Sequence, residues 1–552
     1  MFDLTGQIRY SVVIASSIWG CGVDMLAKIG QKILALVMIS IFAVTCHAQQ
    51  SQAVKLHKQI SLATFGSGSG NDCWGYVSPS GREYAIMGLN NKVAFVEITD
   101  PANAVIVGSV PHTASLWGSV KVYNGVVYAV TEASGTGIQV IDIRNIDNGV
   151  ITLVRTIASP GRTHNVVMDE DNGFLYTVGS RNGTGTTMCF DLTDPTNPVQ
   201  VGPASMTTNY HHDAQIVTYD SGPFAGKQIW YGFSEGRGID IYDMTNKSNP
   251  VMIKRVIYPN MGYCHQGWLS HDKRYLYVDD EFDESNLQVP TRSLIFNVED
   301  PLNAYYVGSF TTGLLAIDHN QYVDDGFVFQ ANYRSGLRVF EVGDNPISPI
   351  QTGWYDTFLA DDNRGYDGAW SCYPFFPSGT VLVSDINTGL YILDVTDATT
   401  RRKAAADFSL LRASIVSGNL ASLAESDGNE LRISEVSGPS ADGSAAGIES
   451  SANAFDSSPD RIEVKVVSRA LSGGYRQRIR VFNWTTNSYD EFSSEPFQLT
   501  STARTVVISN QASRYVQPGT NAVKVQIKWF ADVRTVARLQ AGIDEVSFKF
   551  VR

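Results

Sequence analysis

The chain has 552 residues, which at roughly 150 residues per domain suggests three or four domains, and its 43% hydrophobic content excludes a disordered chain. Only 18% of the residues are charged, and the 48 glycines, 25 tyrosines and 25 phenylalanines favour many short strands joined by tight turns. The net charge of −13 argues against nucleic acid as a partner, because a surface that binds nucleic acid must neutralise phosphates.

Residues 1–48 are expected to be a signal region. From Met25 onward, two lysines precede the apolar run Ile33–Val44, and the small residue Ala48 follows. This order is typical of a secretory signal that starts at Met25 and is cleaved after Ala48. The run is too short to span a bilayer of about 30 Å, which disfavours a retained anchor helix. A lipoprotein attached through Cys46 is a weaker alternative, so we expect an extracellular or cell-surface protein without a transmembrane helix in the mature chain.

A strand that ends in an acidic or polar turn recurs seven times between residues 55 and 398. The copies are VAFVEITDP (93–101), IQVIDIRN (138–145), MCFDLTDP (188–195), IDIYDMTN (239–246), LIFNVEDP (294–301), LRVFEVGD (337–344) and LYILDVTD (390–397). Their spacing suits four-stranded blades, and their alternating apolar residues are typical of strands. The pattern predicts an all-β fold with a seven-bladed β-propeller, because radial closure leaves only short protected edges.

The repeats resemble those of known surface proteins. The strands IQVIDI, IDIYDM and LYILDV resemble the LVIVD repeat of bacterial and archaeal surface proteins. The longer pattern, which includes HDAQIV, GIDIYD, HQGWLS and HNQYV, resembles the choice-of-anchor B family over about residues 55–398. This resemblance implies an exported propeller whose carboxyl-terminal attachment differs between members, and it implies no activity.

The sequence changes character after the repeats. Residues 399–460 are rich in Ser, Ala, Gly and Asp and are interpreted as a linker and domain entry, although their strand-like part could already belong to the next domain. Residues 461–552 contain several strand signals and predict a small antiparallel β-sandwich. SGNLASLAESDGNEL and ARTVVISNQASRYVQPGT resemble a carboxyl-terminal module of secreted planctomycete proteins. Its excess of Lys and Arg suits an anionic envelope polymer, or reflects ordinary scatter of surface charge.

One register of the repeats carries histidine and tryptophan. The seven positions are Trp74, Trp117, His164, His212, His265, His319 and Trp370. Because the innermost strand of a blade lines the central channel, we expect these side chains to form a ring at one end of that channel. Four imidazoles suit Fe, Cu or Zn better than Mg or Ca, so the four histidines are candidate metal ligands. The alternative is a ring of structural histidines that bind water and neighbouring carboxylates.

Charged residues are expected to rim the same end of the channel, in the loops between the second and third strands. These residues are Glu132, Arg181, Glu235, Arg237, Asp280, Glu281, Arg334 and Asp385. Carboxylates within reach of imidazole N–H groups would provide the outer partners that metal-binding histidines require. The polar residue after each histidine is expected to point away from the channel, because side chains alternate along a strand.

Four cysteines follow the signal region: Cys73, Cys189, Cys264 and Cys372. No C-x-x-C motif is present, which disfavours a thiolate zinc site. The first and seventh blades should be neighbours, so a Cys73–Cys372 disulfide is predicted to close the ring, although the opposite parity of the two positions is an objection. Buried free thiols are the alternative for Cys189 and Cys264.

The sequence contains no short catalytic motif in its proper context. It therefore favours a binding scaffold for an extracellular or cell-envelope protein or polymer, with the four-histidine site at the channel mouth. The alternatives are a non-haem metalloenzyme that uses Fe, Cu or Zn for oxidation or hydrolysis, and a purely structural wall component. The metal content of the purified protein would distinguish the scaffold from the enzyme.

Overall fold

The computed structural model describes residues 50–551 apart from 181–186, 204–205, 208, 343–344, 425, 439, 455–456, 460 and 532–537. The predicted signal region, with its start at Met25 and its cleavage after Ala48, lies outside the described residues, so export stays a prediction. The described part contains the short helices α2 (Leu62–Phe65) and α3 (Asp283–Leu287), and no helix there is long and apolar enough to cross a membrane. Short 3-10 helices are η1 (Pro101–Asn103), η2 (Ile146–Asn148), η3 (Gly222–Phe224), η4 (Pro301–Asn303), η5 (Leu420–Leu423) and η6 (Ala512–Tyr515).

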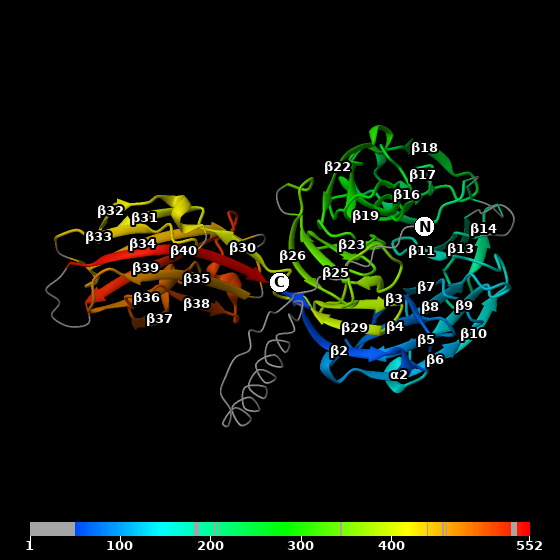
Figure 1. Ribbon diagram of the computed structural model, residues 1–552, viewed down its shortest axis with the longest axis horizontal. Helices are drawn as coiled ribbons and strands as arrows, with labels where there is room; N and C mark the ends of the chain where they lie inside the picture. Colours follow the sequence, from blue (N-terminus) through cyan, green and yellow to red (C-terminus); the bar gives the residue numbers. More distant parts are fainter. Residues whose placement is uncertain are drawn as a thin grey trace, which may run out of the picture. The chain divides into compact units, whose positions relative to one another are not determined.

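Residues 51–394 form seven antiparallel sheets around a common axis, which is the arrangement of a β-propeller (Figure 1). Each innermost strand contacts the next, and the last contacts the first, so the ring is closed. The inner strands are β3 (Gly70–Val77), β7 (Gly118–Tyr123), β11 (Asn165–Asp169), β15 (Asp213–Thr218), β19 (Cys264–Leu269), β23 (Asn320–Asp324) and β27 (Ala369–Tyr373). The second strands are β4 (Glu83–Leu89), β8 (Val126–Thr131), β12 (Phe174–Val178), β16 (Gln228–Phe233), β20 (Tyr275–Asp280), β24 (Phe327–Ala331) and β28 (Thr380–Asp385).

The seven repeat segments found in the sequence form the third strand of each sheet. These are β5 (Lys92–Glu97), β9 (Ile138–Asp142), β13 (Met188–Asp191), β17 (Ile239–Asp243), β21 (Arg292–Asn297), β25 (Leu337–Glu341) and β29 (Gly389–Asp394). The outer strands are β6 (Val105–Pro111), β10 (Thr152–Ile157), β14 (Val199–Val201), β18 (Val251–Val256), β22 (Tyr305–Thr311), β26 (Ile350–Tyr355) and β2 (Lys55–Ser61). In the first six sheets an outer strand thus lies between the polar turn and the next inner strand, whereas the outer strand of the seventh sheet is β2.

Burial decreases from the middle of each sheet to its outer edge. Every residue of β4 and β8 is buried, because both faces of these strands pack against neighbouring sheets. The outer strand β10 is exposed along most of its length. The apolar runs of the sequence therefore mark strands that are covered on both faces, and the polar, less regular strands lie at the rim.

The ring is closed by a strand from the amino-terminal part of the described chain. β2 pairs antiparallel with β29 and supplies the outer strand of the seventh sheet. The short strand β1 (Ser51–Gln52) adds a fifth strand to the sixth sheet by pairing with β26. Ile60 on β2 is buried opposite Leu390, so the closure includes apolar packing as well as backbone hydrogen bonds.

Residues 401–551 contribute to two further antiparallel sheets. One contains β32 (Ala413–Ser417), β33 (Leu431–Glu435), β40 (Gln540–Val551), β35 (Arg461–Ala470) and β38 (Thr502–Ile508), with β30 (Arg401–Ala404) paired to β40. The other contains β31 (Asp407–Leu411), β34 (Ala446–Asn453), β39 (Ala522–Ala531), β36 (Tyr475–Asn483) and β37 (Ser488–Pro496). Apolar residues of both sheets share one hydrophobic cluster. The stretch 399–460 therefore supplies strands to both sheets, which differs from the expected linker, because its apolar residues Leu431, Ile433 and Ile448 are needed in this cluster.

Candidate functional site

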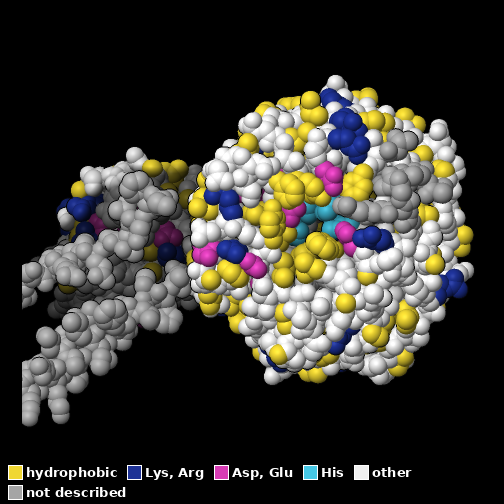
Figure 2. Space-filling view, turned by 45° about the vertical axis from the view of Figure 1, so that its right-hand side comes forward, with side chains coloured by type: hydrophobic (Ala, Val, Ile, Leu, Met, Phe, Trp, Pro, Cys, Tyr) yellow, Lys and Arg dark blue, Asp and Glu magenta, His cyan; other side chains and the backbone are white. Residues whose placement is uncertain are grey.

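The four histidines lie side by side at one end of the channel. His164, His212 and His319 directly precede β11, β15 and β23, and His265 is the second residue of β19. The ring centroids of successive histidines are 4.0, 4.6 and 4.5 Å apart. Figure 2 shows the histidines inside a hollow on one face of the propeller, with acidic and apolar side chains around it. The equal register read from the sequence therefore does bring these four side chains together.

The first two histidines are held by partners outside the ring. Nδ1 of His164 lies 2.7 Å from Oε1 of Glu132. Nδ1 of His212 lies 2.9 Å from the Tyr263 hydroxyl, which donates a hydrogen bond of 2.9 Å to Oε1 of Glu235. Because a carboxylate lies at the outer end of each contact, these contacts favour the tautomer in which Nδ1 carries the proton.

The other two histidines are held by the backbone. Nδ1 of His265 donates to the carbonyl oxygen of His319 at 2.8 Å, and Nδ1 of His319 donates to the carbonyl oxygen of Trp370 at 2.5 Å. Burial, followed by the charge of neighbouring histidines, lowers the pKa of His265 and that of His319 to about 3. Both rings are therefore neutral at physiological pH, with Nε2 available as an acceptor or a metal ligand.

A carboxylate joins the last two histidines. Nε2 of His265 and Nε2 of His319 each lie 3.9 Å from an oxygen of Glu281. One potential ligand atom from each of these three residues falls within 4.8 Å of the others. The hydroxyl of Tyr333 donates to Oε1 of Glu281 at 2.7 Å and so fixes the carboxylate in this position. The sequence had placed Glu281 only on the rim, whereas its geometry also allows it to be a direct ligand.

A small cavity of about 10 Å³ lies among the histidines. Its lining includes the four histidines together with Asp72, Ser119, Asn165, Asp213 and Asn320. This volume is close to that of one water molecule, roughly 10–15 Å³, so the space suits an ion or a water but no organic molecule. The residues that follow the histidines were expected to point away from the channel, and three of them line it instead. The alternation argument fails there because three of the four histidines precede their strands.

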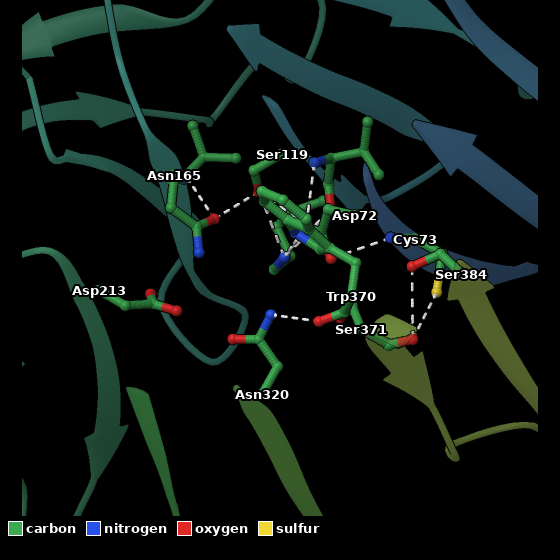
Figure 3. A network of polar contacts seen from close by, with 12 residues as sticks. Asp72, Cys73, Ser119, Asn165, Asp213, Asn320, Trp370, Ser371 and Ser384 are labelled. Carbon is green, nitrogen blue, oxygen red and sulfur yellow. Dashed lines mark hydrogen bonds and ion pairs between the residues drawn. The ribbon is translucent and has the colours of Figure 1, made fainter. Parts of the chain in front are cut away.

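The first two sheets contribute a polar network at this level of the channel (Figure 3). Oδ2 of Asp72 accepts hydrogen bonds of 2.9 Å from the Ser119 hydroxyl and from Nζ of Lys121. Ser119 also contacts Oδ1 of Asn165, and Asn320 donates to the carbonyl oxygen of Trp370 at 2.8 Å. The repeat alignment gave no signal for Asp72, Ser119 or Lys121, because it placed tryptophans in these two sheets.

The three tryptophans do not form one ring with the histidines. Trp370 is buried beside His319, with ring centroids 4.9 Å apart, as expected. Trp117 lies before β7, is 49% exposed and is not among the residues that line the small cavity between the histidines. Trp74 is buried deeper in the channel, where Nζ of Lys121 lies 4.4 Å from its ring centroid. A bulge in β3 between Gly70 and Cys73 shifts Trp74 away from the histidine level.

The charged residues predicted around the mouth divide into two groups. Glu132, Glu235 and Glu281 contact the histidines directly or through a tyrosine. The others have partners elsewhere. Arg237 donates to the carbonyl oxygen of Tyr210, and Arg334 pairs with Asp361 and Asp367. Asp280 accepts from Tyr258 and from two backbone amides, and Asp385 accepts from the amides of Asn387 and Thr388. Arg181 lies outside the described residues. Three of the five carboxylates therefore lie against a histidine or against a tyrosine that contacts one.

The predicted disulfide is not formed. Cys73, Cys189, Cys264 and Cys372 are free and buried. The thiol of Cys73 lies 3.9 Å from the carbonyl oxygen of Ser371, whereas that of Cys372 lies 3.6 Å from the carbonyl oxygen of Phe329 in the sixth sheet. The thiol of Cys73 thus reaches the seventh inner strand from the first sheet, whereas the thiol of Cys372, which belongs to that strand, points toward the sixth sheet. This is the difference in parity that was raised against the disulfide. Burial raises the pKa of Cys73 to about 12.

A second, larger pocket of about 340 Å³ lies further along the inner strands. Aromatic side chains, among them Trp74, Trp268, Tyr322, Tyr373 and Phe375, line part of it. Their rings pack edge to face, with centroids 5.0 Å apart for both Trp74–Tyr373 and Trp268–Tyr322. The sequence analysis did not identify this pocket, because its residues come from several sheets without a common spacing.

The sequence matches no family model and no curated protein. Solved structures similar to this chain include a hypothetical selenium-binding protein from Sulfolobus tokodaii, with 13% identity, a TM-score of 0.41 and coverage of 57% of this chain and 92% of that chain. YCF48 bound to D1 peptide has 11% identity, a TM-score of 0.39 and coverage of 64% and 97%. A chain of the COPII outer coat vertex on membranes has 9% identity, a TM-score of 0.41 and coverage of 59% and 84%. These neighbours are β-propeller-like, but at such identities and TM-scores they carry no argument about function.

Proposed function

We propose that this chain is an exported protein in which a seven-bladed β-propeller is followed by a β-sandwich. In this proposal the propeller binds one divalent transition metal at its channel mouth and serves as a binding scaffold for an extracellular or cell-envelope protein or polymer. The observation that carries the proposal is the group of His265, Glu281 and His319, in which one potential ligand atom of each residue lies within 4.8 Å of the others. His212 and His164 stack next to this group, with ring centroids 4.6 Å apart for His212–His265 and 4.0 Å for His164–His212, and they would complete the ligand set. Each Nδ1 has a partner outside the ring, as is usual for histidines that bind a metal.

The ligand set restricts the class of metal. Neutral imidazoles with one carboxylate suit Zn, Cu or Fe, whereas Mg and Ca prefer oxygen ligands. Binding requires the ring nitrogens to approach the metal to about 2.0–2.1 Å, which the cavity of about 10 Å³ beside the histidines can accommodate. Two features of the four histidines would support the affinity. Burial keeps His265 and His319 neutral, and contacts with Glu132 and Tyr263 orient His164 and His212.

The surface around the mouth supports a binding role. The loops at this end carry exposed apolar side chains, which are Leu116, Trp117, Leu287, Leu315, Leu359 and Tyr366. Apolar side chains that gather on one face of a protein are typical of interaction sites. Figure 2 shows such side chains around the hollow that contains the histidines. We therefore place the partner of the scaffold at this end of the channel.

Metal analysis of the purified full chain tests the proposal. We expect one Zn, Cu or Fe per chain in the wild type, and loss of stoichiometric metal in the variants His212→Ala and His265→Ala. The variant His57→Ala provides a matched control, because His57 lies on the outer strand β2, away from the channel. A wild-type protein that takes up no transition metal after native purification, or variants that keep it, would contradict the proposal.

A metalloenzyme is the second candidate, and the position of Glu281 favours it. A carboxylate 3.9 Å from two ligand nitrogens could exchange a proton with a metal-bound water in a hydrolysis reaction. Turnover of a small substrate that is lost both in His265→Ala and in Glu281→Gln would favour the enzyme over the scaffold. The small volume of the cavity excludes a bulky substrate at the metal itself.

A further inference from the structure

The pocket of about 340 Å³ lies toward the end of the channel that is opposite the histidines. Its lining includes Glu170 and Asp171, which follow β11, whereas His164 precedes that strand. Asp213 and Tyr322 line both this pocket and the small cavity among the histidines, so they separate the two spaces. The volume falls within the range of roughly 300–1,000 Å³ that sites for small molecules occupy.

One wall of the pocket is aromatic. The ring centroid of Phe375, in the loop after β27, lies 5.3 Å from that of Tyr373, 5.9 Å from that of Tyr322, 6.0 Å from that of Trp268 and 6.1 Å from that of Trp74. Each of these four rings also packs against at least one other ring of the group, so the five rings form one packed wall. The face of an aromatic ring carries partial negative charge, which attracts cations.

The protein already places one cation against this wall. Nζ of Lys121 lies 4.4 Å from the ring centroid of Trp74, and Lys121 is the cationic residue of the pocket lining. Its ammonium group forms a buried salt bridge of 2.9 Å with Asp72. The pair of Lys121 and Asp72 is neutral as a whole, so it adds no net positive charge to the pocket.

The other charged residues of the lining are acidic. They are Asp169, Glu170, Asp171 and Asp213, and none of them forms a salt bridge within the part of the chain that the structure describes. Asp213 is only 8% exposed, and its Oδ1 accepts a hydrogen bond of 2.7 Å from the backbone amide of Ala214. Figure 3 shows the Asp213 carboxylate turned toward the channel interior, without a hydrogen bond to the other residues drawn there. A buried carboxylate is costly unless positive charge compensates it, so the pocket favours a cationic ligand.

Two buried glutamines add hydrogen-bond donors to the same pocket. Oε1 of Gln215 accepts from the backbone amide of Leu269 at 2.8 Å, and Oε1 of Gln266 accepts from that of Gln321 at 2.9 Å. These bonds fix the orientation of both side-chain amides. Gln215 and Gln266 are 8% and 2% exposed and line the pocket, and neither Nε2 atom has a partner among the described residues. Each Nε2 is therefore available to donate to an oxygen atom of a ligand.

We propose that this pocket binds a small organic cation, namely a methylated ammonium compound that also carries a hydroxyl or carboxylate oxygen. Aromatic rings bind such ammonium groups because the ring faces attract the positive charge. Asp213 would balance this charge, and the Nε2 atoms of Gln215 and Gln266 would donate to the oxygen of the ligand. A neutral sugar could use the rings and the amides, but it would leave the buried carboxylate of Asp213 uncompensated.

A path for the ligand leads along the first sheet. Trp74, Glu170 and Tyr373 line the pocket and also an adjoining hollow of about 600 Å³. The cationic residue of that hollow, Arg144, pairs with Asp142 and does not compete for the carboxylates of the pocket. The ligand would thus enter from the face opposite the histidines, and its binding does not require a metal at the channel mouth.

Calorimetric titration of the full-length protein with choline tests the proposal. The matched control ligand is the neutral carbon analogue of choline, in which a tert-butyl group replaces the trimethylammonium group. We expect choline to bind, and the neutral analogue to bind at least about tenfold more weakly. Trp268→Leu and Asp213→Asn should each weaken choline binding by about tenfold. Trp117→Leu should bind choline as the wild type does, because Trp117 is exposed at the histidine end of the channel.

Three results would overturn the proposal. Equal affinities for choline and its neutral analogue would show that the pocket selects apolar shape and not charge. Binding of glucose without binding of choline would make it a sugar site, and the absence of choline binding to the wild type would refute it outright. If Trp268→Leu does not fold, the comparison of the two ligands on the wild type and on Asp213→Asn decides the question.

Discussion

Nδ1 of His164 and Oε1 of Glu132 lie 2.7 Å apart, and this contact joins the residue before the inner strand β11 of the third sheet to the loop after β8 of the second sheet. A charge-assisted hydrogen bond of this length orients the imidazole and increases its basicity as a ligand. Both residues are partly buried, so water screens the contact only weakly.

We expect Glu132→Gln to weaken metal binding by about 10- to 100-fold, because an amide holds the imidazole less firmly than a carboxylate does. Competition titration with a chromophoric chelator measures the affinity. Glu299→Gln is the control, since Glu299 forms an exposed ion pair with Arg274 on the outside of the propeller. Equal affinities for wild type and Glu132→Gln would show that His164 is not a ligand.

Tyr263 connects His212 to Glu235, so Tyr263→Phe should break this connection while the ring keeps its place. We expect metal affinity to fall by about tenfold, and the thermal stability of the metal-free protein to change by only about 1 kcal/mol. Tyr305→Phe provides the control, because Tyr305 is 55% exposed on an outer strand. A loss of stability without a loss of affinity would make Tyr263 a structural residue only.

Asp240 predicts an acid-sensitive step in the fourth sheet. Burial opposes its ionisation, but hydrogen bonds from His211 and Arg255 outweigh this effect and lower the pKa of Asp240 to about 2. Because this value is below the ordinary 3.8, the ionised carboxylate stabilises the fold above about pH 4, and this contribution is lost as the pH falls toward 2. Asp240→Asn should destabilise the protein at pH 7 by about 3 kcal/mol and reduce the loss of stability between pH 4 and 2. Chemical denaturation at several pH values measures both effects.

The strand that closes the ring should contribute measurably to stability. Ile60 on β2 is 4% exposed, so Ile60→Ala removes buried apolar surface and should cost about 2–4 kcal/mol. Leu56 on the same strand is 42% exposed, and Leu56→Ala should cost less than about 1 kcal/mol. Thermal denaturation of both variants checks the difference. Equal effects would show that β2 does not pack as described.

The four free thiols should be inert in the folded protein. Burial raises the pKa of Cys73 and that of Cys189 to about 12, so almost no thiolate is present at pH 8. For the chain that would remain after the predicted cleavage at Ala48, which lacks Cys21 and Cys46, we expect no reaction with a thiol reagent in the native state and four reactive thiols after unfolding. Two thiols after unfolding without reductant would instead indicate a disulfide in the purified protein.

The sequence predicted the propeller because its signal is periodic. Seven similar third strands occur at similar spacing, and their polar turns, as at Asp300 and Pro301, mark the strand ends. The closing strand β2 was not predicted, because KLHKQIS alternates weakly and its partner β29 is more than 300 residues away. Residues 399–460 were interpreted as a linker and domain entry, with the alternative that their strand-like part belongs to the next domain, because the strands between 401 and 453 are short and rich in serine and alanine.

The histidines were predictable because each occupies the same place at the start of an inner strand. The adjacent His211 shows the limit of this argument: it is one residue earlier than His212, and it points into the fourth sheet, where Nε2 lies 3.3 Å from Asp240. Tyr263 was missed because its hydroxyl reaches His212 from another sheet, and no sequence spacing records such a contact. Trp117 lies in the loop before β7, where the strand register used for the prediction does not apply.

The pairing of β2 with β29 has a consequence for the order of events during folding. Ser61 is paired with Gly389. The strand β2 is therefore synthesised early, but it can pair only after the other strands of the seventh sheet exist. Contacts between such distant residues form slowly, and until then the outer edge of the seventh sheet and the backbone of β2 are both open to other chains. Folding of this ring is therefore most exposed to aggregation at its last step, and a chaperone that covers β2 until that step would raise the yield of the native protein.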